Sequence, residues 1–278
     1  MFQGRRLLIA TKHGKEQVLA PLLEQSLGVV CFTHSGFDTD LLGTFSGEVE
    51  RTLDPISAVR EKCRLSAEAS GCDLLLGSEG SFGPHPLIPF VLANEEVLLF
   101  MDVRNNIEIM ARMVSTETNF NGRILEDLDA LHAFAQVCGF PEHALILRRA
   151  VHEPKEIVKG IRDIGQLHEV FHRFREQFGS VYAETDMRAM HNPTRMSVIG
   201  MAGQQLARKI KSLCPDCGMP GFDVSEVRKG LECALCGTAT GATLNHLYRC
   251  THCACEREEW YPHGKKKQDP MYCDVCNP

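Results

Sequence analysis

Four Cys-x-x-Cys pairs are confined to residues 214–276 and constrain the fold more than any other feature of the sequence. They are Cys214/Cys217, Cys233/Cys236, Cys250/Cys253 and Cys273/Cys276. Paired in chain order, they form two four-cysteine sets with the spacings C-x2-C-x15-C-x2-C and C-x2-C-x19-C-x2-C. Zn2+ prefers four thiolates in a tetrahedron, and one pair presents two of them from a single turn. Disulfides or redox-active pairs are the alternative, but two complete sets predict two structural zinc sites.

The length and composition fit one large globular domain followed by this metal-binding module. The 278 residues are 44% hydrophobic and 24% charged, as in ordinary soluble proteins. The apolar runs are too short to span a bilayer, and the first residues reach charged side chains too soon for a secretory signal. Because thiolate ligands need a reducing environment, we expect the protein in the cytoplasm and not on a membrane. We expect an α/β domain over residues 1–211 and a double zinc ribbon over residues 212–278.

The charge of the chain bears on its partners. The formal net charge is -6, whereas non-specific nucleic-acid binding needs a basic surface. Lys265–Lys267 form a local basic run that reads more simply as a solvated turn. Nucleic acid is therefore a less favoured partner than a phosphorylated small molecule, or than a protein bound through the zinc ribbons.

The apolar pattern predicts alternating strands and helices over residues 6–211. Strands are expected at Arg6–Thr11, Gly28–Thr33, Cys72–Ser78, Ala144–Arg148 and Val181–Ala183, and helices at Lys15–Ser26, Pro55–Ser70, Leu125–Val137, Ile164–Phe178 and Pro193–Lys211. Glu96–Asp102 and Ile107–Ser115 should form a β-hairpin. Asp54 and Asn192 are expected to cap the helices that follow them. This order predicts a mixed sheet flanked by helices.

The turn Thr11-Lys12-His13-Gly14-Lys15 lies where the first strand is expected to lead into the first helix. A helix N-terminus offers free backbone N–H groups and favours an anion. Thr11 adds a hydroxyl, Lys12 and Lys15 add cations, and Gly14 permits close backbone approach. The spacing is not that of a Walker motif, and an ordinary surface turn is the simpler reading of this segment taken alone.

A second candidate is the glycine-rich segment Gly77–His85, which contains Glu79. The preceding strand is expected to deliver this carboxylate to its carboxyl end, where open α/β sheets bind ligands. One carboxylate suits Mg2+, which proteins usually hold through one or two carboxylates together with substrate phosphates. A turn carboxylate without such a role is the alternative.

Two further segments carry polar clusters. The expected long loop Ser35–Gly47, with its acids and hydroxyls, could close over a substrate, although a solvated loop is the simpler reading. Glu184–Arg188 and the helix start after Asn192 bring Arg188 and Arg195 close to strand and helix ends. Two arginines there suit phosphate or base recognition. A capped helix with a structural arginine–carboxylate pair is the alternative.

These segments occur in an order that resembles the inosine/xanthosine triphosphatase type of nucleoside triphosphate pyrophosphatase, within the Maf-like superfamily. The resemblance covers residues 6–118 and extends less securely to residue 211. It rests on Ile9-Ala10-Thr11-x-x-x-Lys15, on Glu50, Ala58 and Lys62, and on Asp73-Leu-Leu-Leu-Gly77-Ser78-Glu79-Gly80. Phe82–Pro89 and the zinc module are foreign to that group. The whole chain also resembles a bacterial domain family of unknown function that ends in paired zinc ribbons.

The resemblance implies Mg2+-dependent cleavage between the α- and β-phosphates of a nucleoside triphosphate, with release of pyrophosphate. It implies that Thr11 and Lys15 hold phosphates and that Glu79 holds Mg2+. Lys12, His13, Lys62, Arg188 and Arg195 complete the candidate substrate-binding residues. The alternative is an adaptor that binds a protein or nucleic acid through its zinc ribbons, with an N-terminal domain that senses a ligand or is inactive. Exposed apolar residues on the ribbons, with Trp260 and Tyr261 as candidates, would favour the adaptor.

Overall fold

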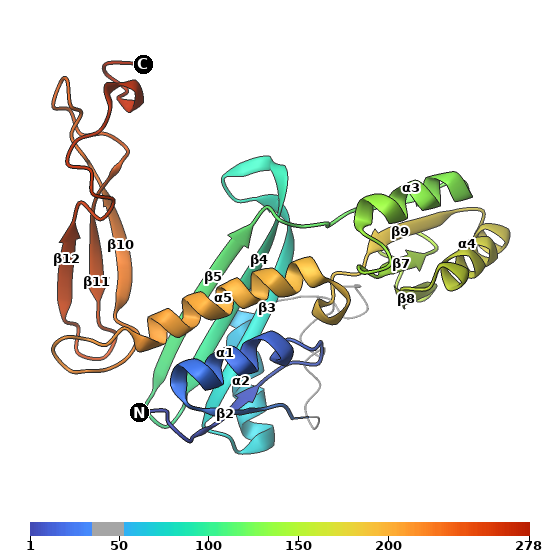
Figure 1. Cartoon of the computed structure of the whole chain (residues 1–278), viewed down its shortest axis with the longest axis horizontal. Coiled ribbons are helices and arrows are strands. Elements are labelled where there is room, and N and C mark those ends of the chain that lie inside the picture. The colour runs from blue at the N-terminus through green and yellow to red at the C-terminus, as the bar shows by residue number, and fades with distance from the viewer. Residues whose placement is uncertain (35–52) are drawn as a thin grey trace. The chain divides into compact units, whose positions relative to one another are not determined.

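The computed structural model describes residues 1–34 and 53–278 and divides into two units, Met1–Ala207 and Arg208–Pro278 (Figure 1). The division falls inside helix α5 (Pro193–Lys211), slightly before the boundary expected between residues 211 and 212. The predicted loop at 35–47 lies outside the described residues. Within the described part of the chain, none of the helices combines the length and the apolar character needed to cross a bilayer.

A five-stranded mixed sheet forms the first part of the N-terminal unit, with the strand order β2-β1-β3-β4-β5. The strands are β1 (Arg6–Ile9), β2 (Val30–Phe32), β3 (Leu74–His85), β4 (Ile88–Asp102) and β5 (Ile107–Ser115). Strand β1 is parallel to β2 and β3, whereas β4 is antiparallel to both of its neighbours. The helices α1 (Glu16–Leu27), α2 (Pro55–Ser70) and α5 accompany this sheet. The expected α/β architecture with a mixed sheet is confirmed, but the strands expected at Ala144–Arg148 and Val181–Ala183 do not join this sheet.

Both faces of this sheet are covered, which explains its nearly continuous apolar strands. Val59 and Cys63 of α2 pack against one face, in a cluster with Leu8, Leu75, Val97 and Leu99. Alternation along the strands turns their neighbours to the opposite face. Helices α1 and α5 approach each other closely, because a Cβ at Gly203 would lie 2.8 Å from Leu19 Cδ2.

Two predicted helix caps are present. Asp54 Oδ1 accepts hydrogen bonds from the backbone N–H groups of Ile56 at 2.9 Å and Ser57 at 3.1 Å, and Pro55 occupies the first helical position of α2. Asn192 Oδ1 accepts from the backbone N–H of Arg195 at 2.9 Å. These bonds satisfy N–H groups that have no partner inside the helix, which is why both helices begin where the sequence indicated.

Residues 77–85 are strand, and the glycine-rich loop predicted there is wrong. Strand β3 continues to His85, paired with β4 from Gly77 opposite Leu99 to His85 opposite Ile88. The predicted hairpin of β4 and β5 is correct at its turn, but β4 begins eight residues earlier than expected, at Ile88 instead of Glu96. Residues 88–95 provide the ladder partner of residues 81–85, and residues 96–99 that of residues 77–80. Local glycine signals do not reveal these partners, so tertiary pairing overrides the intrinsic preference.

A four-stranded antiparallel sheet forms the rest of the N-terminal unit, with the order β6-β9-β7-β8. Its elements are β6 (Gly122–Leu125), α3 (Leu128–Cys138), β7 (Leu145–Arg148), β8 (Ile157–Ile161), α4 (Ile164–Phe178) and β9 (Val181–Thr185). Helices α3 and α4 share one hydrophobic core with the strands. The sequence did not predict β6 and β8. Both are short edge strands with only one neighbour each, so they lack the apolar runs of interior strands.

The C-terminal unit contains a three-stranded antiparallel sheet in the order β10-β11-β12. The strands are β10 (Asp223–Lys229), β11 (Thr243–Arg249) and β12 (Glu256–Trp260). Because the chain reverses direction at each connection, segments that precede or follow these strands alternate between the two ends of the sheet. This alternation decides which cysteine pairs meet.

Candidate functional site

The eight predicted zinc ligands form two clusters, but not in chain order. The first cluster contains Cys214, Cys217, Cys250 and Cys253, and the second contains Cys233, Cys236, Cys273 and Cys276. The chain-order pairing is therefore wrong, as is the picture of two ribbons in tandem. The first pair precedes β10 and the third lies between β11 and β12, at one end of the sheet. The second and fourth pairs lie at the other end, so the strand meander interleaves the two sets.

The geometry of both clusters fits Zn2+. In each cluster the four Sγ atoms lie within 4.8 Å of one another. Closest approaches are 3.6 Å for Cys214–Cys253 and Cys217–Cys250 in the first cluster, and 3.6 Å for Cys236–Cys273 in the second. Four Zn–S bonds of about 2.3 Å in a tetrahedron place sulfurs roughly 3.8 Å apart. The described residues can thus hold two zinc ions, and Cys255, which packs beside the first cluster, belongs to neither set.

A second, chemically different cluster lies beyond the carboxyl end of β1. Lys15, at the start of α1, is buried and donates a hydrogen bond to Ser78 Oγ at 2.8 Å. Lys62 of α2 donates to the Ser78 carbonyl at 3.2 Å and forms an ion pair with Glu79. Two lysines from different helices therefore meet one short segment of β3. The structure brings Lys15, Lys62 and Glu79 together.

Arg195 and Glu96 form a fully buried ion pair on α5 and β4. Arg195 Nε lies 2.7 Å from Glu96 Oε1, and both side chains are 0% exposed. A Cβ at Gly80 would collide with the Arg195 guanidinium and lie 2.6 Å from Glu96 Oε1, so only glycine leaves room for the pair. The guanidinium carbon also lies 5.3 Å from the centre of the Phe82 ring. Arg195 is held from several sides.

Burial and neighbouring charge change the protonation of this cluster. Burial lowers the pKa of the Lys15 ammonium to about 7, and the positive charge of Arg195 acts in the same direction. Burial also lowers the pKa of His13 to about 3, assisted by the charge of Lys15. His13 is consequently a neutral imidazole near pH 7. Its backbone N–H donates to Thr11 Oγ1 at 3.2 Å, which orders the turn.

Lys15 differs from the other cations in how its charge is balanced. Within the described residues, its ammonium has a hydroxyl partner in Ser78 but no ion-pair partner. Lys62 and Arg195 are each paired with a carboxylate. An incoming anion could therefore supply the counter-charge that Lys15 lacks, and would raise its pKa again.

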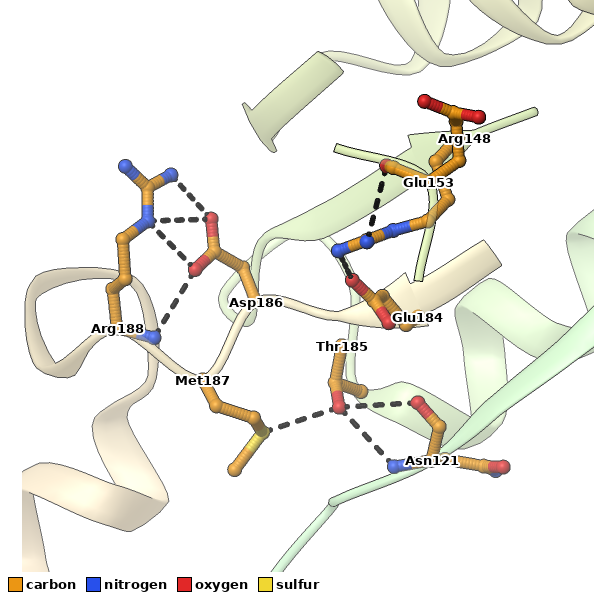
Figure 2. A network of polar contacts seen from close by, with 8 residues as sticks. All are labelled: Asn121, Arg148, Glu153, Glu184, Thr185, Asp186, Met187 and Arg188. Atoms are coloured by element: carbon orange, nitrogen blue, oxygen red, sulfur yellow. Dashed lines mark hydrogen bonds and ion pairs between the residues drawn. The ribbon is translucent and has the colours of Figure 1, made fainter. Parts of the chain in front are cut away.

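Arg188 is near the turn at residues 11–15 and is oriented by Asp186. The fully buried Asp186 carboxylate accepts from Arg188 Nε at 2.9 Å and from its backbone N–H at 3.1 Å (Figure 2). Arg188 also acts electrostatically on His13, to which it is close enough to lower the pKa. The following 3-10 helix packs on the turn, since a Cβ at Gly14 would lie 3.4 Å from Met190 Cβ.

The same strand end carries a second ion pair of Arg148 with Glu184 (Figure 2). Arg148 Nη1 also donates to the Glu153 carbonyl at 3.3 Å. Burial raises the pKa of Glu184. Figure 2 shows Asp186 and Glu184 directed to different arginines, so the two acids of this segment do not form one site.

The structure places the remaining predicted residues at the edge of the cluster, and it adds others. Thr11 is half-buried and Lys12 is exposed. Sequence reasoning missed Ser78 and Glu96 as members of the polar cluster, whereas the pair of Arg188 with Asp186 is the arginine–carboxylate pair that it gave as an alternative. Glu96 carried a signal that could have found it, because an acid inside a strand of buried apolar residues needs a buried partner.

No curated protein matches the sequence of this chain. Residues 62–278 match the family described as "Domain of unknown function (DUF6671)". The match runs from α2 through both cysteine clusters. Of the polar cluster, it includes Lys62, Glu79 and Arg195 but not Lys15. Because it spans most of the chain, the protein belongs to the DUF6671 family.

Proposed function

We propose that the N-terminal unit is a Mg2+-dependent hydrolase that cleaves a nucleoside triphosphate, or a related phosphorylated compound, and releases pyrophosphate. One observation carries the proposal: the buried Lys15 ammonium, without a carboxylate partner among the described residues, lies beside Lys62 and Glu79. A buried cation in this state favours an anionic ligand. The resemblance of Thr11, Lys15 and Glu79 to the inosine/xanthosine triphosphatase pattern supports the same reading.

In this proposal each residue has a role that follows from its charge and position. Lys15 and Thr11 hold phosphate oxygens at the start of α1, where backbone N–H groups also favour an anion. Lys62 neutralises charge that develops during cleavage. Arg188, fixed by Asp186, contacts the substrate together with Lys12 and His13. Arg195, fully buried against Glu96, acts on the bound anion through its charge alone.

The described residues fit Mg2+ only in combination with substrate. Glu79 is 14% exposed and is paired with a lysine, whereas Glu96 is fully buried by its arginine. Glu79 is therefore the carboxylate best placed to hold the ion, and substrate phosphates would complete its coordination. When bound, Mg2+ supplies Lewis-acid polarisation of the phosphates.

The proposed reaction consumes one water molecule. The water oxygen forms a bond to the α-phosphorus, and the bond from that phosphorus to the oxygen bridging to the β-phosphate breaks. The bridging oxygen leaves with the electron pair as part of pyrophosphate, and the proton from water passes to solvent. The other product is a nucleoside monophosphate. Positioning and charge neutralisation do most of the catalysis in such a reaction.

Pyrophosphate release from a panel of standard and deaminated nucleoside triphosphates with Mg2+ tests the proposal. Glu79→Gln should lower turnover by about 100-fold or more, as loss of a key electrostatic group does. Glu108→Gln is the matched control, because Glu108 is an exposed carboxylate paired with Arg60. Absence of turnover on every triphosphate by folded, zinc-loaded wild type would refute the hydrolase.

A second candidate function, a protein adaptor, is favoured by exposed apolar side chains near the second cysteine cluster. Leu235 is 75% exposed, and Met271, Tyr272 and Val275 are each at least 60% exposed. Trp260, expected from the sequence, is 53% exposed, whereas Tyr261 is only half-exposed. Such residues mark protein contacts more often than nucleic-acid contacts. We further propose the reducing cytoplasm as the location, because both clusters require free thiolates.

A further inference from the structure

A cavity of about 520 Å3 lies beside the five-stranded sheet, where Phe32 and His34 line it from the carboxyl end of β2. Arg5 and Arg6 line it from the start of β1, Asp73 from the start of β3, and Arg104 from the turn between β4 and β5. Because β1 and β3 are parallel, their starts share one edge of the sheet, and Lys15 and Thr11 follow the other edge. None of the residues that line the cavity belongs to the candidate site described above, so the two are distinct.

The three arginines of the cavity are held in different ways. Arg5 donates to both oxygens of Asp102, at 2.6 and 2.9 Å, and lies 3.1 Å from Asp73. These two carboxylates neutralise the charge of Arg5, so Arg5 has a structural role in lining the cavity. Arg6 and Arg104 have no acidic partner among the described residues. Two unneutralised guanidinium groups facing one cavity favour an anion.

The cavity also offers a flat surface and hydrogen-bond acceptors. The guanidinium carbon of Arg6 lies 4.2 Å from the centre of the Phe32 ring, so the ring supports one face of the guanidinium. The other face can stack on a conjugated ring, as arginine does with nucleic-acid bases. Helix α2 ends beside the cavity at Ser70 and Gly71. Backbone carbonyls at a helix C-terminus accept hydrogen bonds and disfavour a ligand that is anionic throughout.

We infer that this cavity binds a nucleoside monophosphate. Arg104 takes the phosphate, Arg6 stacks on the base, and the C-terminal end of α2 faces the hydroxyl and amino groups. A volume of about 520 Å3 lies within the roughly 300–1,000 Å3 typical of small-molecule sites. The inference does not depend on the proposed hydrolase, since no residue is shared.

Isothermal titration of the full zinc-loaded chain with the four common ribonucleoside monophosphates tests this site. At least one should bind, and Arg104→Gln and Arg6→Gln should each weaken it about tenfold or more. Arg173→Gln, which removes an exposed arginine from α4, should leave the dissociation constant within about twofold. Adenosine and inorganic phosphate test the two parts of the ligand separately. Each should bind more weakly than adenosine monophosphate.

Three titration outcomes would overturn the inference. They are no binding by the wild type, binding by both arginine variants as tight as that of the wild type, and binding that is lost only in Lys15→Met. The last result would place the monophosphate in the candidate hydrolase site. Alkylation of Cys72, followed by peptide mass spectrometry, gives a readout in the unmutated protein. Cys72 lines the cavity, so a saturating monophosphate should slow its modification. An unchanged Cys72 rate would count against the site even if a variant failed to fold.

Discussion

The five-stranded sheet of the N-terminal unit and the three-stranded sheet of the C-terminal unit differ greatly in burial. Leu74–Leu76 of β3 and Val97–Phe100 of β4 are at most 1% exposed, whereas every residue of β12 is exposed. The larger sheet is covered on both faces and the smaller one is not. Burial of apolar area can therefore stabilise the first unit but contributes much less to the second.

Half of the buried apolar and sulfur-bearing residues of the C-terminal unit are potential metal ligands. Its fully or nearly buried apolar and sulfur-bearing residues are Ile210, Cys214, Leu231, Cys233, Leu247, Cys250, Cys255 and Cys273. Five of these eight are cysteines, and four of the five belong to the clusters. Units of this size rarely fold on a small core alone and often rely on a metal. The first unit instead places charges in its interior, which costs stability and is typical of a ligand site.

The largest expected effect is on the metal-dependent unit. Cys233→Ser should release one zinc ion and unfold the second-cluster end of the sheet, because structural zinc contributes about 10 kcal/mol or more to such folds. Zinc content and hydrogen exchange measure both effects. Amides of β3 and β4 in the N-terminal unit should keep their protection.

The same variant distinguishes interleaved from chain-order pairing. With interleaved clusters, Cys273 and Cys276 become reactive toward an alkylating reagent and Cys214 and Cys217 stay protected. Chain-order pairing requires the reverse. Cys255→Ser is the matched control, since this buried thiol lies outside both clusters, and it should retain two zinc equivalents.

The next largest effect concerns the buried ion pair of the N-terminal unit. Arg195→Met leaves the Glu96 carboxylate buried without its partner, which should cost about 3–5 kcal/mol of unfolding free energy. Arg64→Met removes an exposed arginine that pairs with Glu61 and Glu68, and should cost far less, because water screens exposed ion pairs. Hydrogen exchange of β4 amides at increasing urea reports the difference. Equal losses in the two variants would mean that burial does not set the energy of these pairs.

The smallest predicted effect is a pH dependence from Lys15. Its pKa is about 7 in the folded chain and 10.5 as its ordinary value, so between these pH values the unfolded chain binds more protons. Unfolding free energy should therefore rise with pH from about 7 to 10, by at most a few kcal/mol. Lys15→Met should flatten this rise and be more stable than wild type at pH 7. Parallel wild-type and Lys15→Met curves over this window would show that Lys15 stays charged in the folded unit.

Much of the fold is predictable where local signals and tertiary structure agree. Pro55–Ser70 begins at its predicted Asp54 cap and ends before a glycine in the left-handed region, as the sequence indicates. Residues 77–85 show where prediction from local sequence signals fails. Glycines, serines and a proline in this segment suggested a loop, yet residues 77–80 pair with residues 96–99, and residues 81–85 pair within the segment 88–95. Such a pairing depends on residues that a local pattern does not include.

The sites show the same limit. Eight ligands were predictable because Cys-x-x-Cys is a local motif, but their pairing depends on the direction of three strands and was predicted wrongly. In the N-terminal unit, Lys15 and Glu79 could be selected from motifs, whereas the buried role of Glu96 depends on Arg195, which is 99 residues away in the sequence. Charge pairing across a fold is set by packing, not by spacing.

The interleaved clusters also determine when, during synthesis of the chain, each zinc site can form. The first cluster lacks its last ligand until residue 253 has been made, and by then two ligands of the second cluster, Cys233 and Cys236, have already emerged without their partners. Residue 276 must follow before the second cluster can close. Neither metal can therefore be captured by an early piece of the unit that folds on its own. A single cleavage between β11 and the second cysteine pair would separate the ligands of both ions at once.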